Sequence, residues 1–164
     1  MSIFSKIVSG GQTGVDRAAL DVAMELGIHS GGWCPKGRRA EDGAIPHQYP
    51  LQEASSSEYP VRTRLNIEDS DGTLILCCGA PAGGTALTLK LARRLRKPHL
   101  LIDLAEEAGA RKVIDWGKQN DVQTLNVAGP REGECPGVYE RATPFLRDVL
   151  TKIKASPQIS SQQK

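Results

Sequence analysis

The chain has 164 residues, 39% of them hydrophobic, and a formal net charge of +2. This length predicts one domain, residues 1–154, that buries about two-thirds of the surface its unfolded chain exposes. So small a charge, with Lys and Arg scattered along the chain, argues against nucleic-acid or membrane partners. No apolar run reaches membrane-spanning length and no signal-peptide core is present, so we expect a cytoplasmic protein. Residues 155–164, rich in Ser and Gln, are expected to form a flexible tail.

A glycine turn between a strand and a helix is the first candidate binding element. The turn is Gly10-Gly11-Gln12-Thr13-Gly14; it follows a β-branched run, and apolar residues then recur at helical spacing up to Leu26. Unpaired N–H groups and the dipole at such a helix start favour an anion, commonly phosphate. Gly27 is expected to end the helix in the left-handed conformation. The alternative is a tight turn that binds nothing.

Four further strands alternate with helices along the chain. The strands are expected at 29–33, 72–78, 99–103 and 124–128, and the helices around 58–66, 86–96, 106–120 and 139–153. The apolar 72–78 run is typical of a central strand covered on both faces. Pro144 either kinks the last helix or marks its true start. The alternation predicts an α/β fold with a doubly wound, mainly parallel sheet of about five strands and helices on both faces.

Residues 34–59 form a long segment with little periodicity. They are too rich in aromatic residues, Ile and Pro to be a linker, and a loop of this length in a compact domain is usually functional. We expect Lys36 and Arg38 in this segment, and Arg62 on the following helix, to close over a ligand. Asn66 lies four residues after Arg62 and therefore shares its helix face.

Three turns are expected to meet at one edge of the sheet, because ligands of open doubly wound sheets bind at the carboxyl ends of the strands. These turns are 10–14, the second glycine-rich turn at 79–85 with Gly83, Gly84 and Thr85, and the turn at 129–133 with Arg131. Their convergence predicts a pocket for a phosphate-bearing ligand.

Several known functional motifs match this sequence poorly. A Walker A loop needs a Lys-Ser/Thr pair where Val15-Asp16 stands, and a dinucleotide fingerprint needs an acid where Gly31-Gly32-Trp33 stands. Asp69-Ser70-Asp71-Gly72-Thr73 looks like a phosphatase DxDGT motif, but its apolar strand follows the first Asp instead of preceding it. The four cysteines lack CxxC spacing and the three histidines are isolated, so no metal site is predicted.

Longer motifs resemble the molybdenum carrier family over nearly the whole chain except the tail. They are GGQTGVDRAALD at 10–21, GWCPKGR at 32–38, Arg62-Thr63 with Asn66, 69–73, Gly83–Thr85 and NVAGPR at 126–131. The resemblance implies a Rossmann-like fold of the SLOG superfamily and self-association into a homo-oligomer. It also implies binding of molybdenum cofactor or another phosphorylated nucleotide-like ligand. The motif residues Gln12, Thr13, Asp16 and Asn66 thereby join the candidate site.

The same superfamily includes phosphoribohydrolases of the lysine-decarboxylase-like group, whose signature is PGGxGTxxE. This chain has PAGGTALT at 81–88, so Thr88 stands where the catalytic Glu would be. We therefore expect a binding or carrier protein without catalytic residues. The alternatives are a nucleoside-monophosphate N-glycosidase, with Asp16, Asp69 or Asp71 supplying the carboxylate, and a sensor of nucleotide ligands.

Overall fold

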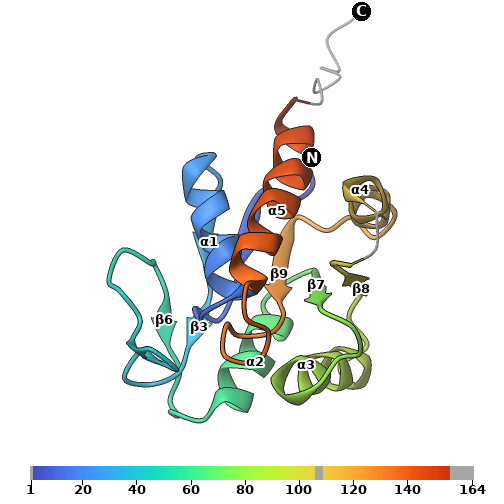
Figure 1. The fold of residues 1–164 in the computed structure, drawn as a ribbon. Coiled ribbons are helices and arrows are strands. Elements are labelled where there is room, and N and C mark those ends of the chain that lie inside the picture. The colour runs from blue at the N-terminus through green and yellow to red at the C-terminus, as the bar shows by residue number, and fades with distance from the viewer. Residues whose placement is uncertain (1, 106–108, 156–164) are drawn as a thin grey trace, which may run out of the picture.

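A computed structural model describes residues 2–105 and 109–155. Its centre is a five-stranded sheet in the order β2-β1-β9-β7-β8, and every pair of neighbouring strands is parallel. Helices lie on both sides of this sheet, as Figure 1 shows. The fold is thus the predicted α/β, Rossmann-like arrangement.

The elements alternate along the chain as the sequence predicts. The sheet strands are β1 (Lys6–Val8), β2 (His29–Gly31), β7 (Gly72–Cys77), β8 (His99–Asp103) and β9 (Thr124–Ala128). The helices are α1 (Val15–Glu25), α2 (Tyr59–Glu68), α3 (Gly83–Arg94), α4 (Ala110–Gln119) and α5 (Val138–Ala155). Four short strands, β3 (Trp33–Cys34), β4 (Arg39–Ala40), β5 (Gly43–Ala44) and β6 (Gln52–Glu53), lie between β2 and α2.

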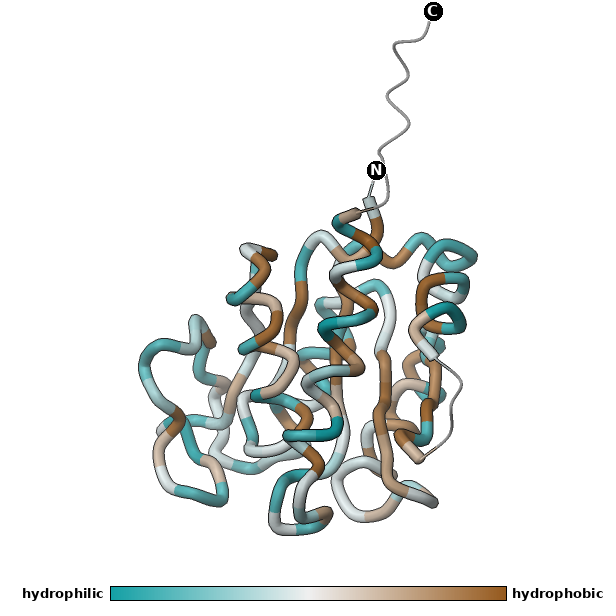
Figure 2. Tube along the Cα trace, turned by 45° about the horizontal axis from the view of Figure 1, so that its top comes forward, coloured by the Kyte–Doolittle hydropathy of each residue, from teal (hydrophilic) through white to brown (hydrophobic). Residues whose placement is uncertain are grey.

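The sheet is covered on both faces. Helix α5 packs against both α1 and α4 on one face, and α2 packs beside α3 on the other. Strand β7 is buried along its whole length, so its side chains meet apolar groups on both sides. Leu74 and Leu76 join the main core with α1 and α5. Figure 2 shows hydrophobic segments running through the middle of the molecule.

The segment between β2 and α2 forms a small unit of its own at one side of the sheet (Figure 1). Strand β3 pairs with β6 in parallel, and β4 pairs with β5 in an antiparallel hairpin. A second, smaller apolar cluster holds this unit against α1; its buried members are Leu20, Cys34, Ala40, Ile45 and Tyr49. This cluster explains the aromatic and aliphatic content of a segment without periodicity.

The ends of the helices agree with most sequence expectations. Gly27 follows α1 with a φ of 69°. Pro144 lies inside α5, which begins six residues earlier at Val138. Helix α4 begins at Ala110, and the expected start near Glu106 falls on residues outside the described ones. Helix α5 reaches Ala155, while the rest of the expected tail, 156–164, also lies outside them.

The strand order creates one place where the connections diverge. Helix α1 leaves β1 toward one face of the sheet and α3 leaves β7 toward the other, with β9 between the two strands. Such a switch point opens a crevice at the carboxyl ends of the strands. Across the described ranges, no helix is long and apolar enough to cross a membrane.

Candidate functional site

A pocket occupies the predicted edge of the sheet. The empty space within it, open solvent at its mouth included, is about 700 Å³. Four segments line it: the turn after β1, one face of α2, the first turns of α3, and β9 with the loop that follows. The lining residues are Gly10, Gln12, Asp16, Tyr59, Arg62, Thr63, Asn66, Gly84, Thr85, Leu87, Thr88, Asn126, Val127, Ala128, Gly129, Arg131 and Glu134.

The glycine turn before α1 is already satisfied by protein groups. The Gln12 N–H donates to Asp16 Oδ2 at 3.1 Å, and the Thr13 N–H donates to Gln12 Oε1 at 3.0 Å. The Val15 N–H donates to the carbonyl of Pro130 at 3.2 Å. Since these amides have acceptors inside the protein, the turn is organised by its own side chains.

Asp16 and Arg62 form a buried ion pair over the same turn. Arg62 Nη1 lies 3.1 Å from Asp16 Oδ2, and the two side chains are only 11% and 8% exposed. Burial raises the pKa of Asp16, while Arg62 and the Gln12 N–H act in the opposite direction. A Cβ on Gly10 would lie 1.5 Å from Arg62 Nη1. Gly10 is therefore the residue that lets the guanidinium reach Asp16.

The turn before α3 is different, because it keeps an unused polar group. The N-cap residue, Ala82, has no side chain that could accept from the first N–H groups of α3. Thr85 is 3% exposed, lines the pocket, and its Oγ1 has no hydrogen-bond partner among the described residues. Thr88, one turn later, donates its hydroxyl to the carbonyl of Gly84 at 2.9 Å. A buried hydroxyl without a partner is costly, which indicates a ligand position beside Thr85.

Arg131 brings positive charge to the mouth of the pocket. Its Nε lies 3.2 Å from Glu41 Oε2 and 3.5 Å from Glu134 Oε1. Neither contact is aligned as a hydrogen bond, so the Nε–H has no acceptor among the residues that the structure describes. Arg131 is therefore paired by charge but keeps donor capacity for an anionic ligand.

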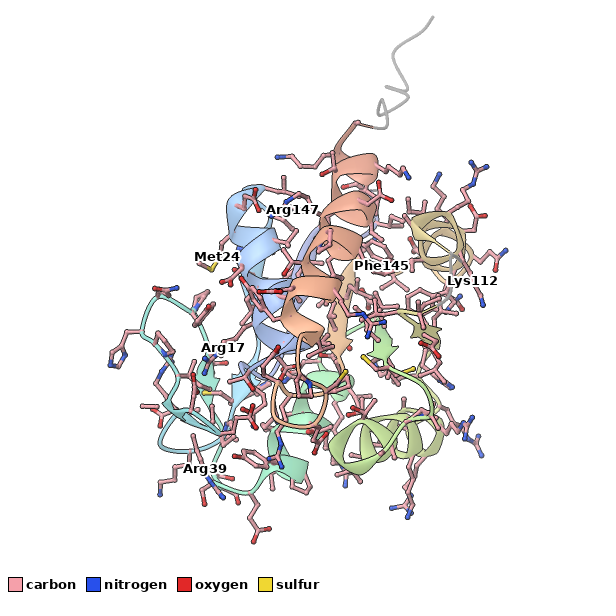
Figure 3. All side chains as sticks on the ribbon, in the orientation of Figure 1. Arg17, Met24, Arg39, Lys112, Phe145 and Arg147 are labelled. Atoms are coloured by element: carbon pink, nitrogen blue, oxygen red, sulfur yellow. The ribbon has the colours of Figure 1, made fainter. Side chains whose placement is uncertain are left out.

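The β4–β5 hairpin is fastened to this site through Glu41 and Asp42. Glu41 accepts from the Thr13 hydroxyl and from the Gly133 N–H, and its own N–H donates to Gln12 Oε1 at 2.9 Å. Arg17 of α1, labelled in Figure 3, pairs with Asp42, with Nη2 2.8 Å from Oδ1. Glu41 could not be recognised from the sequence, because an exposed Glu in an irregular segment gives no signal of its contacts.

Eight of the fourteen sequence-predicted site residues line the pocket: Gly10, Gln12, Asp16, Arg62, Asn66, Gly84, Thr85 and Arg131. Gly11, Thr13, Gly14 and Gly83 lie in the adjoining turns but do not line it. The side-chain amide of Asn66 bonds to the backbone of Trp33. Its Oδ1 accepts from the Trp33 N–H at 2.8 Å, and its Nδ2 donates to the Trp33 carbonyl at 2.9 Å. Tyr59 and Thr63 also line the pocket. Tyr59 lies three residues before Arg62 and so shares its helix face, which is the signal that could have found it, while Thr63 belongs to the Arg62-Thr63 motif.

Lys36 and Arg38 do not reach the pocket lining. The guanidinium of Arg38 donates to the carbonyls of Ile45, Pro46, Tyr49 and Leu51 and so holds the loop between β5 and β6 together. Lys36 is exposed. The two remaining candidate carboxylates also lie outside the lining: Asp69 accepts from Trp33 Nε1 at 2.7 Å, and Asp71 Oδ2 accepts the N–H groups of Gln123 and Thr124.

No metal-binding cluster of three or more His, Cys, Asp or Glu is found within residues 2–105 and 109–155. The pocket is instead lined by amides, hydroxyls and one buried ion pair, with Arg131 at its mouth. This chemistry suits an organic ligand with an anionic group.

A family comparison identifies the relatives of this chain. The model of the circularly permutated YpsA SLOG family matches residues 7–150. The chain belongs to this SLOG family. A comparison with curated proteins finds no match.

A solved structure extends the family assignment. The crystal structure of a "Putative molybdenum carrier protein" from Syntrophus aciditrophicus SB is 46% identical to this SLOG chain and superposes with a TM-score of 0.87. The match covers 90% of this chain and 95% of that one. The resemblance drawn from the sequence motifs is thus confirmed, and with it the Rossmann-like fold.

Proposed function

We propose that this protein binds a phosphorylated nucleotide-like small molecule, with molybdenum cofactor as the preferred ligand, and acts as its carrier. The observation that carries the proposal is the buried, unpartnered hydroxyl of Thr85 at the start of α3. It coincides with a helix N-terminus whose N-cap offers no side-chain acceptor. A phosphate there would accept hydrogen bonds and interact favourably with the helix dipole.

The phosphate end of the ligand is assigned to the first turn of α3. Gly84 lines the pocket, and no atom lies within 4 Å of the place where its Cβ would be, so an anion can approach the backbone closely. Arg131, at the pocket mouth, supplies the positive charge. Charge-assisted hydrogen bonds of this kind contribute about 1.5–3 kcal/mol each.

The other end of the ligand is assigned to the wall formed by Tyr59, Arg62 and Asp16. Arg62 stacks over the ring of Tyr59 at 5.5 Å and holds Asp16 at the pocket floor. A planar, hydrogen-bonding ring such as a pterin or a purine suits an amphipathic wall of this kind. The name of the similar crystal structure favours the molybdenum-containing pterin. The metal would be cargo held by the pterin, and the protein side chains would hold the organic part.

The alternative is a nucleoside-monophosphate N-glycosidase. Cleavage of that bond needs a carboxylate near the ribose and an activated water. Thr88 is neutral and its hydroxyl is engaged by Gly84, while Asp69 and Asp71 lie outside the pocket lining. Asp16 is therefore the one candidate base among those three acids, and Arg62 already pairs with it. These contacts support binding without hydrolysis.

The decisive test compares two threonines of the same helix. Thr85→Val removes the unpartnered hydroxyl, whereas Thr88→Val removes one that is bonded within the helix. Calorimetry with GMP, AMP and a pterin monophosphate should show about 10- to 100-fold weaker binding for Thr85→Val, the loss of one hydrogen bond to a charged group. Thr88→Val should keep the affinity within about threefold. Equal affinities of Thr85→Val and the unchanged protein would refute the phosphate assignment.

Two further measurements bear on the same proposal. Native mass spectrometry of freshly purified protein should reveal a co-purifying phosphorylated ligand and its mass. Chromatography of AMP and GMP after long incubation should show no release of free base. Multiple turnovers that Asp16→Asn abolishes would favour the hydrolase instead.

Self-association and a cytoplasmic location remain predictions from the sequence and its family resemblance. Light scattering of the purified protein over a range of concentrations tests the first. Fractionation of cells that produce the full chain tests the second.

A further inference from the structure

A second, smaller cavity lies beside the candidate pocket, and the two share Thr85 and Glu134 in their walls. Cysteines dominate the chemistry of this second cavity: Cys77, Cys78 and Cys135 all line it. Cys77 is the last residue of β7 and Cys78 follows it, while Cys135 comes from the loop between β9 and α5. Residues 57 positions apart in sequence thus bring their thiols to one cavity.

Cys78 and Cys135 are neighbours across this cavity. Both residues line it and both side chains are half-buried, so a small reagent can reach them, and Cys135 is the neighbouring group that acts most strongly on the Cys78 thiol. The Sγ of Cys77 is engaged elsewhere, donating to the carbonyl of Ile102 at 3.5 Å. The fourth cysteine, Cys34, is fully buried in the second apolar cluster.

The surroundings give the two thiols different roles. Burial and the neighbouring Cys135 raise the pKa of Cys78 to about 11. Arg141 Nη1 lies 3.5 Å from Cys78 Sγ and lowers that pKa in part, so a Cys78 thiolate would find a positive partner when it forms. The first attack is assigned to Cys135, and the resolving step to Cys78, which has Arg141 beside its sulfur.

We propose that Cys78 and Cys135 form a reversible intramolecular disulfide by exchange with a low-molecular-weight disulfide such as oxidised glutathione. The Cys135 thiolate attacks one glutathione sulfur, breaks its S–S bond and releases one glutathione thiolate, which leaves a mixed disulfide on Cys135. Cys78 then loses its proton to water, attacks the Cys135 sulfur and expels the second glutathione thiolate. The two protein thiols are oxidised, and one glutathione disulfide is reduced to two thiols.

Such a bond would join the two loops that flank the candidate pocket. Cys78 begins the loop that leads into α3, and Cys135 lies four residues after Arg131. The cross-link would thereby tie the helix start that carries Thr85 to the loop that carries Arg131 and Glu134. The proposal rests on the thiol pair alone and does not depend on which ligand the pocket takes.

The test uses the full chain, reduced and then equilibrated in glutathione buffers of increasing oxidised fraction. After acid quenching and alkylation, intact-mass analysis should show loss of two of the four alkylatable thiols. Peptide mapping should place the bond between Cys78 and Cys135, and dithiothreitol should restore all four thiols. Persistent mixed disulfides without a cross-link would overturn the proposal, and so would a bond that joins any other pair.

Serine variants assign the roles. Cys78→Ser should stop at one glutathione adduct on Cys135, and Cys135→Ser should lose the cross-link and most of the adduct. Cys77→Ser is the matched control, because it removes a neighbouring thiol from the same cavity while leaving the pair. It should cross-link as the unchanged protein does. Loss of the cross-link in Cys77→Ser, with the fold intact by circular dichroism, would contradict the assignment.

Discussion

The turns that open α1 and α3 differ in what satisfies their backbone, although both follow parallel strands and both are rich in glycine. Before α1, Asp16 and Gln12 accept from the turn amides of Gln12 and Thr13, and the Pro130 carbonyl accepts from the first helical N–H, that of Val15. At α3, the residues before the helix are Ala80-Pro81-Ala82, which carry no polar side chain. A glycine-rich turn therefore indicates an anion site only when its own side chains cannot act as the anion.

The largest expected effect is on the free energy of unfolding, and it concerns the glycine turn before α1. Asp16→Ala leaves Arg62 charged and nearly buried and removes the acceptor of the Gln12 N–H. We expect the free energy of unfolding to fall by about 3–5 kcal/mol, the usual result of breaking a buried pair from one side. Urea unfolding measures this change.

The matched control for this variant is Asp42→Ala, which breaks the pair with Arg17 by removing a carboxylate that is itself half-exposed. It should cost less than about 1 kcal/mol. Comparable losses in the two variants would mean that the turn at α1 is not organised by its ion pair.

The second effect concerns Gly10. Gly10→Ala places a methyl group where Arg62 Nη1 now lies and must push the guanidinium away from Asp16. We expect a loss of about 2–4 kcal/mol in the free energy of unfolding, because the same buried pair is disrupted. Combining Gly10→Ala with Asp16→Ala should add little to the loss, since both act on one interaction. Full additivity in the urea experiment would contradict this origin.

The third effect is on ligand binding, and it concerns the turn before α3. Gly84→Ala meets no atom within 4 Å of its new Cβ, so the free energy of unfolding should stay within about 1 kcal/mol of the unchanged protein. The methyl group would instead occupy the space assigned to phosphate. Calorimetry should show about tenfold weaker binding of a nucleoside monophosphate, comparable to one lost charge-assisted hydrogen bond. Unchanged affinity would place the phosphate elsewhere.

The smallest effect concerns a carboxylate beside that turn. Glu134 Oε1 lies 3.1 Å from the position of a Gly83 Cβ and 3.5 Å from Arg131 Nε. It is a negative charge near the place assigned to the phosphate. Glu134→Gln should therefore strengthen phosphate binding, by up to about fivefold for a half-exposed charge. Glu140→Gln, which makes the same charge change on an exposed residue of α5, should leave the affinity unchanged.

The fold could be predicted because its signals are local. The apolar run of β7, the glycine after α1 and the helical spacing of α3 each require no knowledge of distant residues. The edge of the sheet that holds the pocket followed from the strand alternation. The pairing of β3 with β6 and of β4 with β5 could not be predicted, since strands of two residues carry no periodicity.

The contacts of a charged side chain could not be predicted where that side chain had a choice of partners. Arg38 stands in a basic cluster, yet its guanidinium donates to four carbonyls of a loop that lacks regular hydrogen bonding. Glu41 lies in an exposed hairpin, but the fold brings it to the turn of α1 and to Arg131. The sequence shows which side chains are charged. The conformation of the folded loop determines which of them form hydrogen bonds or ion pairs within the protein.

The order of the central sheet also governs how this chain must be assembled during translation. Strand β9 is the last strand to be synthesised, yet it lies between β1 and β7. Until residues 124–128 emerge from the ribosome, β1 and β7 each present an open edge, and the two halves of the sheet cannot join. Unpaired strand edges of this kind invite pairing with other chains. The nascent chain therefore presents more open strand edges before β9 is made than after it has joined the sheet.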